Sequence, residues 1–175
     1  DVVDPQTLKF KLNKALSEDE ELELSMDNLI IDYDLDLSKL ESLLNRGFEL
    51  DTLKYFEVGF SDKKQRIVIP VRDGSYKIVG MIGRAINGDQ EPRYLYTTGF
   101  KRAKVLFNLC NAKQYDSVIV VEGSLDAMKV HQAGFPNVVA TLGSKISEIQ
   151  FLYLRKCFNE IIIFSDNDVA GEAMK

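Results

Sequence analysis

The pattern of hydrophobic and polar positions predicts two short helices in the first half of the chain, followed by an antiparallel hairpin. Apolar residues recur at helical spacing between Ser38 and Gly47, which predicts a helix capped by Ser38 and ended by Gly47. Asp51 is the expected cap of a second short helix. Residues 66–86 then form two β-rich runs separated by the turn residues Asp73–Ser75. We therefore expect a hairpin within an antiparallel sheet.

The pattern changes after residue 116, where unbroken apolar runs alternate with helical segments. The expected order is strand, helix, strand, helix, strand, at residues 118–121, 124–133, 137–141, 147–157 and 160–164. Such runs predict a parallel sheet covered on both faces. The sequence thus predicts an α/β protein: a mixed α+β lobe at 1–115 and a βαβαβ lobe at 116–175.

Composition narrows the class of protein. The chain has 175 residues, 45% hydrophobic content and a net charge of −5, enough to bury a core but without an overall basic coat. Its two cysteines, Cys110 and Cys157, form no metal-binding or disulfide pattern, and no apolar run is long enough to cross a bilayer. We expect a cytoplasmic protein. Because the sequence starts without Met and stops inside an apparent helix, we expect it to be part of something larger.

Acidic residues gather at the strand ends of the predicted parallel sheet. Glu122 follows the first strand, and Asp166 and Asp168 follow the third, while Asp126 begins the helix after Glu122. In open parallel sheets, ligands bind at the carboxyl ends of the strands. Carboxylates gathered there repel each other unless a cation lies between them. Oxygen ligands suit Mg²⁺, so the pattern favours phosphoryl or nucleotidyl transfer.

Each acidic motif also has an ordinary structural interpretation. A Glu-Gly pair after a strand is common turn chemistry, and an Asp-x-Asp before a helix is common helix-start chemistry. Either motif by itself is weak evidence for a metal site. Their occurrence at the ends of two strands of one βαβαβ unit is stronger evidence.

These motifs also carry a family resemblance. The segments VVEGSLDAMKVHQAGFPNVVATLGS and IIIFSDNDVAGEA resemble the Toprim domain shared by DnaG-type primases, topoisomerases and some nucleases. Upstream, LLNRGFELDTLKYFEVGF, RIVIPVRDGSYKIVGMIGRAI and PRYLYTTGFKRAKVLFNL resemble, in order, the helical region and basic sheet of DnaG-type primase cores. The resemblance covers roughly Ser38 to Lys175, and its order is more specific than the acidic motifs.

The resemblance implies an acidic metal site and a basic face. Catalytic acids would be Glu122, Asp166 and Asp168, with Asp126 as a further metal ligand and Glu122 also placed for proton transfer. Nucleotide and nucleic-acid contacts would come from Arg72, Arg84, Arg93, Lys101, Arg102, Lys104, Gly123 and Gly143. A solvent-facing charge is the alternative for each of these cations, and a plain strand-to-helix turn for Gly123.

As a whole, the resemblance implies a DNA primase, a nucleotidyltransferase acting as a DNA-directed RNA polymerase. It would use Mg²⁺, with Mn²⁺ as an alternative, and act with single-stranded DNA template, ribonucleoside triphosphates, RNA primer and the replicative helicase of a primosome. Rival interpretations are a Toprim topoisomerase, an OLD-like nuclease or a non-catalytic nucleic-acid-binding remnant.

The sequence also departs from the family pattern. Tyr96–Thr97 stands where the family often has Asn-Ser. The family's zinc module and its acidic pair beyond Asp168 have no counterpart in these residues. The resemblance therefore predicts primer synthesis for the intact protein, and weak metal and DNA binding for this stretch by itself.

Overall fold

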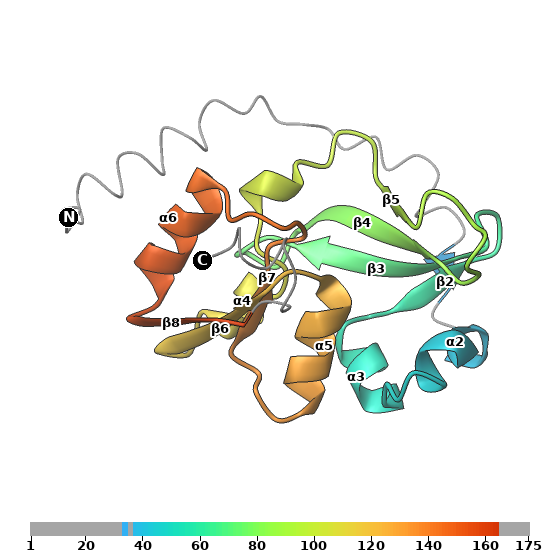
Figure 1. The fold of residues 1–175 in the computed structure, drawn as a ribbon, viewed down its shortest axis with the longest axis horizontal. Helices are drawn as coiled ribbons and strands as arrows, with labels where there is room; N and C mark the ends of the chain where they lie inside the picture. The colour runs from blue at the N-terminus through green and yellow to red at the C-terminus, as the bar shows by residue number, and fades with distance from the viewer. Residues whose placement is uncertain (1–32, 35–36, 165–175) are drawn as a thin grey trace.

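The computed structural model describes residues 33–34 and 37–164, which form two sheets (Figure 1). An antiparallel sheet has the strand order β1-β2-β3-β4-β5, and a parallel sheet has the order β7-β6-β8. The first comprises β1 (Tyr33–Asp34), β2 (Gly59–Ser61), β3 (Arg66–Arg72), β4 (Ile78–Ala85) and β5 (Tyr94–Tyr96). The second comprises β6 (Ser117–Val121), β7 (Val138–Ala140) and β8 (Glu160–Ile163). The expected fold class, with its βαβαβ lobe, is confirmed.

Helices connect and cover the strands. They are η1 (Leu37–Leu40), α2 (Glu41–Leu44), α3 (Leu50–Tyr55), η2 (Arg102–Lys104), α4 (Leu109–Ala112), α5 (Ser124–Gln132) and α6 (Glu148–Cys157). The expected caps were wrong: Ser38 lies inside η1, and Asp51 lies in the first turn of α3 after the N-cap Glu49. Neither α2 nor α3 has a side-chain hydrogen bond at its N-cap, and Leu40 and Leu53 are fully buried.

The β3–β4 hairpin confirms the predicted turn. The Asp73 carboxylate accepts hydrogen bonds from the backbone N–H groups of Ser75 at 2.7 Å and Lys77 at 3.1 Å. Such side-chain bonds to the following backbone are the reason that Asp favours turns. The strands then pair in antiparallel register, with Ile69 opposite Ile82 and both side chains buried.

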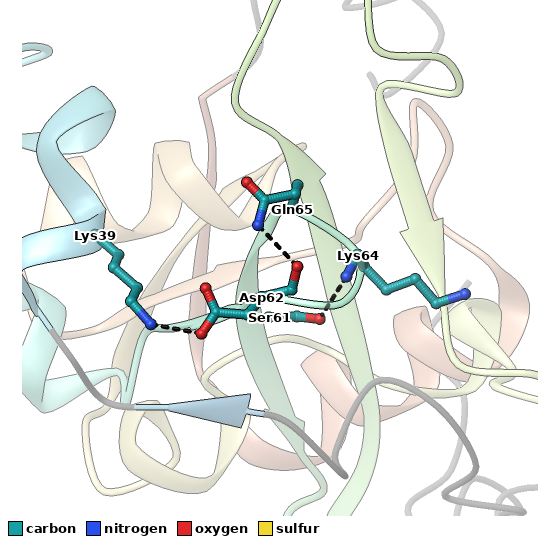
Figure 2. Close-up of polar contacts among 5 residues, drawn as sticks. All are labelled: Lys39, Ser61, Asp62, Lys64 and Gln65. Atoms are coloured by element: carbon teal, nitrogen blue, oxygen red, sulfur yellow. Dashed lines mark hydrogen bonds and ion pairs between the residues drawn. The ribbon is translucent and has the colours of Figure 1, made fainter.

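The β2–β3 turn ties the first helices to the sheet (Figure 2). The Lys64 N–H donates to Ser61 Oγ at 3.1 Å, and the Gln65 side-chain amide donates to the Asp62 carbonyl at 2.8 Å. Lys39 of η1 forms an ion pair with the Asp62 carboxylate at 2.5 Å. The turn is thereby closed locally and also held against η1.

In the parallel sheet, β6 is the central strand and pairs with both neighbours. Its inward residues Val118 and Val120 are fully buried, as the unbroken apolar run predicts. Burial on both faces fails at β8, where Ile162, Ile163 and Phe164 are 46%, 38% and 65% exposed. Consecutive strand side chains point to opposite faces, so both faces are exposed here, at the edge of the described part of the sheet.

The two sheets share one hydrophobic core, and α5 packs against α3 between them (Figure 1). The Gly47 carbonyl accepts from the Lys129 ammonium and, at 3.0 Å, from the Gln132 side-chain amide. The Gln132 side-chain oxygen accepts from the Glu49 N–H at 2.9 Å. These bonds fix the helix that follows Glu122 to the loop between α2 and α3.

Candidate active site

Glu122 and Asp126 lie together at the carboxyl end of the central strand. Glu122 directly follows β6, and its carbonyl accepts a hydrogen bond from the Leu142 N–H at 2.9 Å. Asp126 lies in the first turn of α5, and its carboxylate accepts from the Gly123 N–H at 3.1 Å. This bond satisfies a donor at the helix start and turns the carboxylate back toward the strand end.

Gly123 leaves space for a close approach of the Asp126 carboxylate at this turn. Its φ is −102°, which any residue can adopt, but a Cβ at this position would collide with the Asp126 carboxylate. A larger residue would therefore force the Asp126 carboxylate to shift from its present position. In contrast, a Cβ on Gly143 would meet nothing within 4 Å, so packing does not explain that glycine.

A hollow of about 440 Å³ joins the acidic strand end to the basic lobe. Six of the predicted site residues line it together: Arg93, Arg102, Glu122, Gly123, Asp126 and Gly143. The side chains of Tyr94 and Tyr96 complete the side formed by β5. The structure thus brings carboxylates and guanidinium groups, from positions about 20 to 33 residues apart in the sequence, to one cavity.

Arg102 is held in this hollow by a residue that sequence reasoning missed. Gln150 is 1% exposed, and its side-chain amide donates to the carbonyls of Arg102 at 3.2 Å, Val105 at 2.7 Å and Thr141 at 2.8 Å. Arg102 itself donates to the Leu142 carbonyl at 3.3 Å. The signal in the sequence was the capping box of Ser147 and Gln150, whose backbone N–H groups and side chains bond to each other at the start of α6.

A smaller, basic hollow of about 340 Å³ adjoins the first, and Arg102 lines both. Lys101, Lys145 and Gly143 also line it. Cations on two sides, with the Gly143 backbone between them, suit an anionic group such as phosphate.

A third hollow, of about 420 Å³, contains Arg84 and Arg93 and adds Arg46, which the sequence analysis did not single out. Arg84 is 7% exposed, and its Nε has no hydrogen-bond partner among the described residues; the same holds for the buried Oγ of Ser42 at this hollow. A buried donor without a partner is costly, and an anion in the hollow would satisfy it.

Other predicted site residues lie apart from these hollows or outside the described residues. Arg72 donates to the Glu57 carboxylate at 2.6 Å and 2.9 Å, and the pair borders a separate hollow. Lys104 is half-buried in η2 and lines none of the three hollows described above. Asp166 and Asp168 lie outside the described residues, although β8, which precedes them, pairs directly with β6.

Within residues 33–34 and 37–164, no three His, Cys, Asp or Glu side chains are grouped closely enough to hold a metal ion. Two of the four predicted metal ligands fall outside that part of the chain. Its helices are also too short or too polar to cross a membrane. Both cysteines are free, and burial raises the pKa of the Cys110 and Cys157 thiols, so neither is suited to nucleophilic chemistry at neutral pH.

Comparisons with known proteins agree with this arrangement. Residues 63–113 match the family model of the DNA primase catalytic core, N-terminal domain, and residues 116–175 match that of the Toprim domain. The chain is 34% identical over 146 residues to a DNA primase of Staphylococcus aureus, and 33% identical over 147 residues to one of Staphylococcus epidermidis. The alignments cover 79% and 80% of this chain. It spans about a quarter, 23%, of each relative.

Solved structures show the same fold. The zinc-binding and RNA polymerase domains of the Aquifex aeolicus primase match with a TM-score of 0.71 and 24% identity, over 97% of this chain and 50% of that chain. The Escherichia coli primase catalytic core matches with a TM-score of 0.68 and 23% identity, over 79% and 58%. The model for residues 63–113 is that of a primase core, and the curated relatives are primases. The chain therefore belongs to the DnaG-type primases and corresponds to part of their catalytic core.

Proposed function

We propose that the protein containing this chain is a DNA primase that synthesises short RNA primers on single-stranded DNA. The observation that carries the proposal is the hollow in which Glu122 and Asp126 face Arg93 and Arg102. Acids that bind a cation and arginines that bind phosphate are the two requirements of nucleotidyl transfer. Family membership supports a polymerase-type transferase over a nuclease or topoisomerase.

The acids fit a hard divalent cation. Toprim primases use divalent metals in general, and we infer Mg²⁺ here because carboxylate oxygens are its preferred protein ligands. Glu122 and Asp126 would hold it, together with Asp166 and Asp168. Such an ion would neutralise charge on the reacting phosphates. Mn²⁺ fits the same oxygen ligands.

The chain's own residues would orient the reactants and move a proton. Glu122 would accept the proton of the attacking 3′-hydroxyl. The 3′-oxygen then bonds to the α-phosphorus of the ribonucleoside triphosphate, and the bond to pyrophosphate breaks. Lys101 and Lys145 would hold phosphates through the adjoining basic hollow.

The template strand would run along the hollow of Arg46, Arg84 and Arg93. The buried Arg84 Nε without a partner supports a phosphate at this place. A DnaG primase catalytic domain solved with bound single-stranded DNA shares the fold of this chain, with a TM-score of 0.68 and 21% identity over 96% of this chain and 64% of that chain. Contacts of this kind bind the backbone of any sequence, because they read phosphate rather than bases.

Substitution of Glu122 in the intact protein tests the function. In a template-directed assay of ribonucleotide incorporation, Glu122→Gln should lower the rate about 1000-fold, or roughly 4 kcal/mol, because it removes a metal-ligand charge and the proton acceptor. Glu160→Gln, an exposed acid at the start of β8, is the matched control and should keep the rate. Full synthesis by Glu122→Gln, or none by the unsubstituted protein, would refute the proposal and favour the non-catalytic alternative.

A further inference from the structure

Tyr96 and Thr97 are neighbours at the end of β5, but their surroundings differ. Thr97 is 6% exposed, and its hydroxyl accepts from the Met81 N–H at 2.8 Å and donates to the Met81 carbonyl at 3.3 Å. A hydroxyl has one proton to donate, and β4 receives it here. Thr97 therefore fixes the end of β5, whereas Tyr96 is the residue that lines the acidic hollow.

The Tyr96 ring is stacked with a guanidinium group. The central carbon of the Arg102 guanidinium lies 4.4 Å from the ring centroid, which is within the range of a cation–π contact. Arg102 is exposed but is also held at its side chain by the Leu142 carbonyl and at its own carbonyl by Gln150. An exposed arginine held at three points loses little further freedom when it binds a ligand.

The stacked pair lies in the same hollow as the acids. Tyr96, Arg102, Glu122 and Asp126 all line the space of about 440 Å³, a volume in the range of small-molecule sites. One part of this space offers carboxylates for a cation with its phosphates. The other part offers two planar groups, and planar guanidinium and aromatic faces are the surfaces on which nucleobases stack.

We propose that Tyr96 and Arg102 form a stacking platform for the nucleobase of the incoming ribonucleotide. The inference rests on the proposed function and identifies the residues that contact the base of the substrate. With the phosphates directed toward the acids and the basic hollow, the base lies against Arg102 and Tyr96. Stacking accepts every base because each has a π-face, so the platform binds all four ribonucleotides with similar strength.

The test is a titration of the intact protein with Mg²⁺ and the triphosphate of 2-aminopurine riboside, whose fluorescence falls on stacking. No template is present, so binding is measured without synthesis. The unsubstituted protein and Tyr96→Phe should quench the fluorescence with equal affinity. Tyr96→Leu, which keeps an apolar side chain but loses the ring, should bind about tenfold more weakly. In synthesis assays the same variant should raise KM for nucleotides with kcat nearly unchanged.

Tyr115→Leu is the control, because Tyr115 is 37% exposed and lines none of the three hollows described above. If Tyr96→Leu lowers the melting temperature so far that the protein unfolds in the assay, Arg102→Gln is tested instead. This variant should show the same loss of nucleotide affinity. If the folded variant binds the 2-aminopurine nucleotide with unchanged affinity, the proposed stacking platform is refuted. Quenching that occurs only when 2-aminopurine is in the template strand also overturns it. Normal quenching without any primer synthesis refutes the proposed function but leaves the platform intact.

Discussion

The parallel and antiparallel sheets place their charged residues by different rules. In the parallel sheet all strands run the same way, so Glu122 and the end of β8 meet at one edge. In the antiparallel sheet neighbouring strands run in opposite directions, and strand ends do not gather. The cations of this lobe come instead from the turn after α2 with Arg46, from β4 with Arg84, from the residue before β5 with Arg93, and from η2 with Arg102.

The difference shows that the acidic half of the site follows from topology, whereas the basic half depends on side-chain anchoring. Arg66 is an example of such an anchor. Its side chain is 3% exposed, and its Nη1 donates to the carbonyl oxygens of Gly83 and Arg93, each at 3.4 Å. Gln150 likewise anchors the backbone of η2, which carries Arg102, by donating to the carbonyls of Arg102 and Val105. Breaking such anchors should disturb the basic half first.

The largest expected effect is a loss of stability when Gln150, an anchor of the basic half of the site, is substituted. Gln150→Glu replaces the amide that donates to three carbonyls with a carboxylate, which places a buried charge against three acceptors. We expect the free energy of unfolding to fall by about 3 kcal/mol, measured by urea denaturation. Gln114→Glu is the matched control: Gln114 is exposed and donates to one carbonyl, so a change below about 0.5 kcal/mol is expected. Equal losses in the two variants would show that Gln150 is no anchor.

Arg93→Gln should produce the next largest effect, on DNA binding. Arg93 lines both the acidic hollow and the hollow of Arg46 and Arg84. Loss of one phosphate contact should weaken binding of single-stranded DNA about tenfold at low salt, and lower the slope of log K against log salt by about 0.7. Fluorescence anisotropy at several salt concentrations measures both quantities. Arg155→Gln, on the exposed side of α6, should change neither.

Arg72 gives a second comparison in the same assay. Because Glu57 already neutralises it at 2.6 Å, Arg72→Gln should weaken DNA binding less than Arg93→Gln does. A loss as large as that of Arg93→Gln would place Arg72 on the DNA-binding face, as the sequence analysis expected.

The smallest effect should be the pH dependence of stability from His131, the one histidine of the chain. Its ring stacks on Tyr55 at 4.4 Å, and burial lowers its pKa below the ordinary value of 6.5. The unfolded chain therefore takes up a proton first as the pH falls. Stability should be fully present above about pH 6.5 and decline as the pH falls through that value toward the folded pKa. Thermal melts from pH 7.5 to 5.5 measure the decline.

His131→Phe keeps a ring against Tyr55 and removes the titration. Its melting temperature should stay constant over the same pH range, apart from the contribution of carboxylates at the acid end. An unaltered decline in this variant would assign the pH dependence to other groups.

The fold could be predicted from the sequence wherever a local pattern had one solution. The Asp73–Ser75 hairpin and the strands and helices from Ser117 to Ile163 are confirmed, because alternation and apolar runs determine them. The caps at Ser38 and Asp51 were wrong, since helix boundaries read from local sequence shift by about one or two residues, and neither α2 nor α3 begins with a side-chain cap. Arg46 and Gln150 were missed because their partners lie tens of residues away in the sequence.

For the site, the sequence by itself determined that Glu122 and Asp126 belong to a strand end and a helix start, because those positions follow from local periodicity. Only the tertiary structure decided which cations face them. In the structure, Arg72 forms an ion pair with Glu57 instead of lining the acidic hollow. Arg93 and Arg102 line that hollow, and Arg102 lies over the Tyr96 ring. The physical reason is that a charged side chain has no periodic signature. Its partner is set by long-range packing and by hydrogen bonds that pin its backbone.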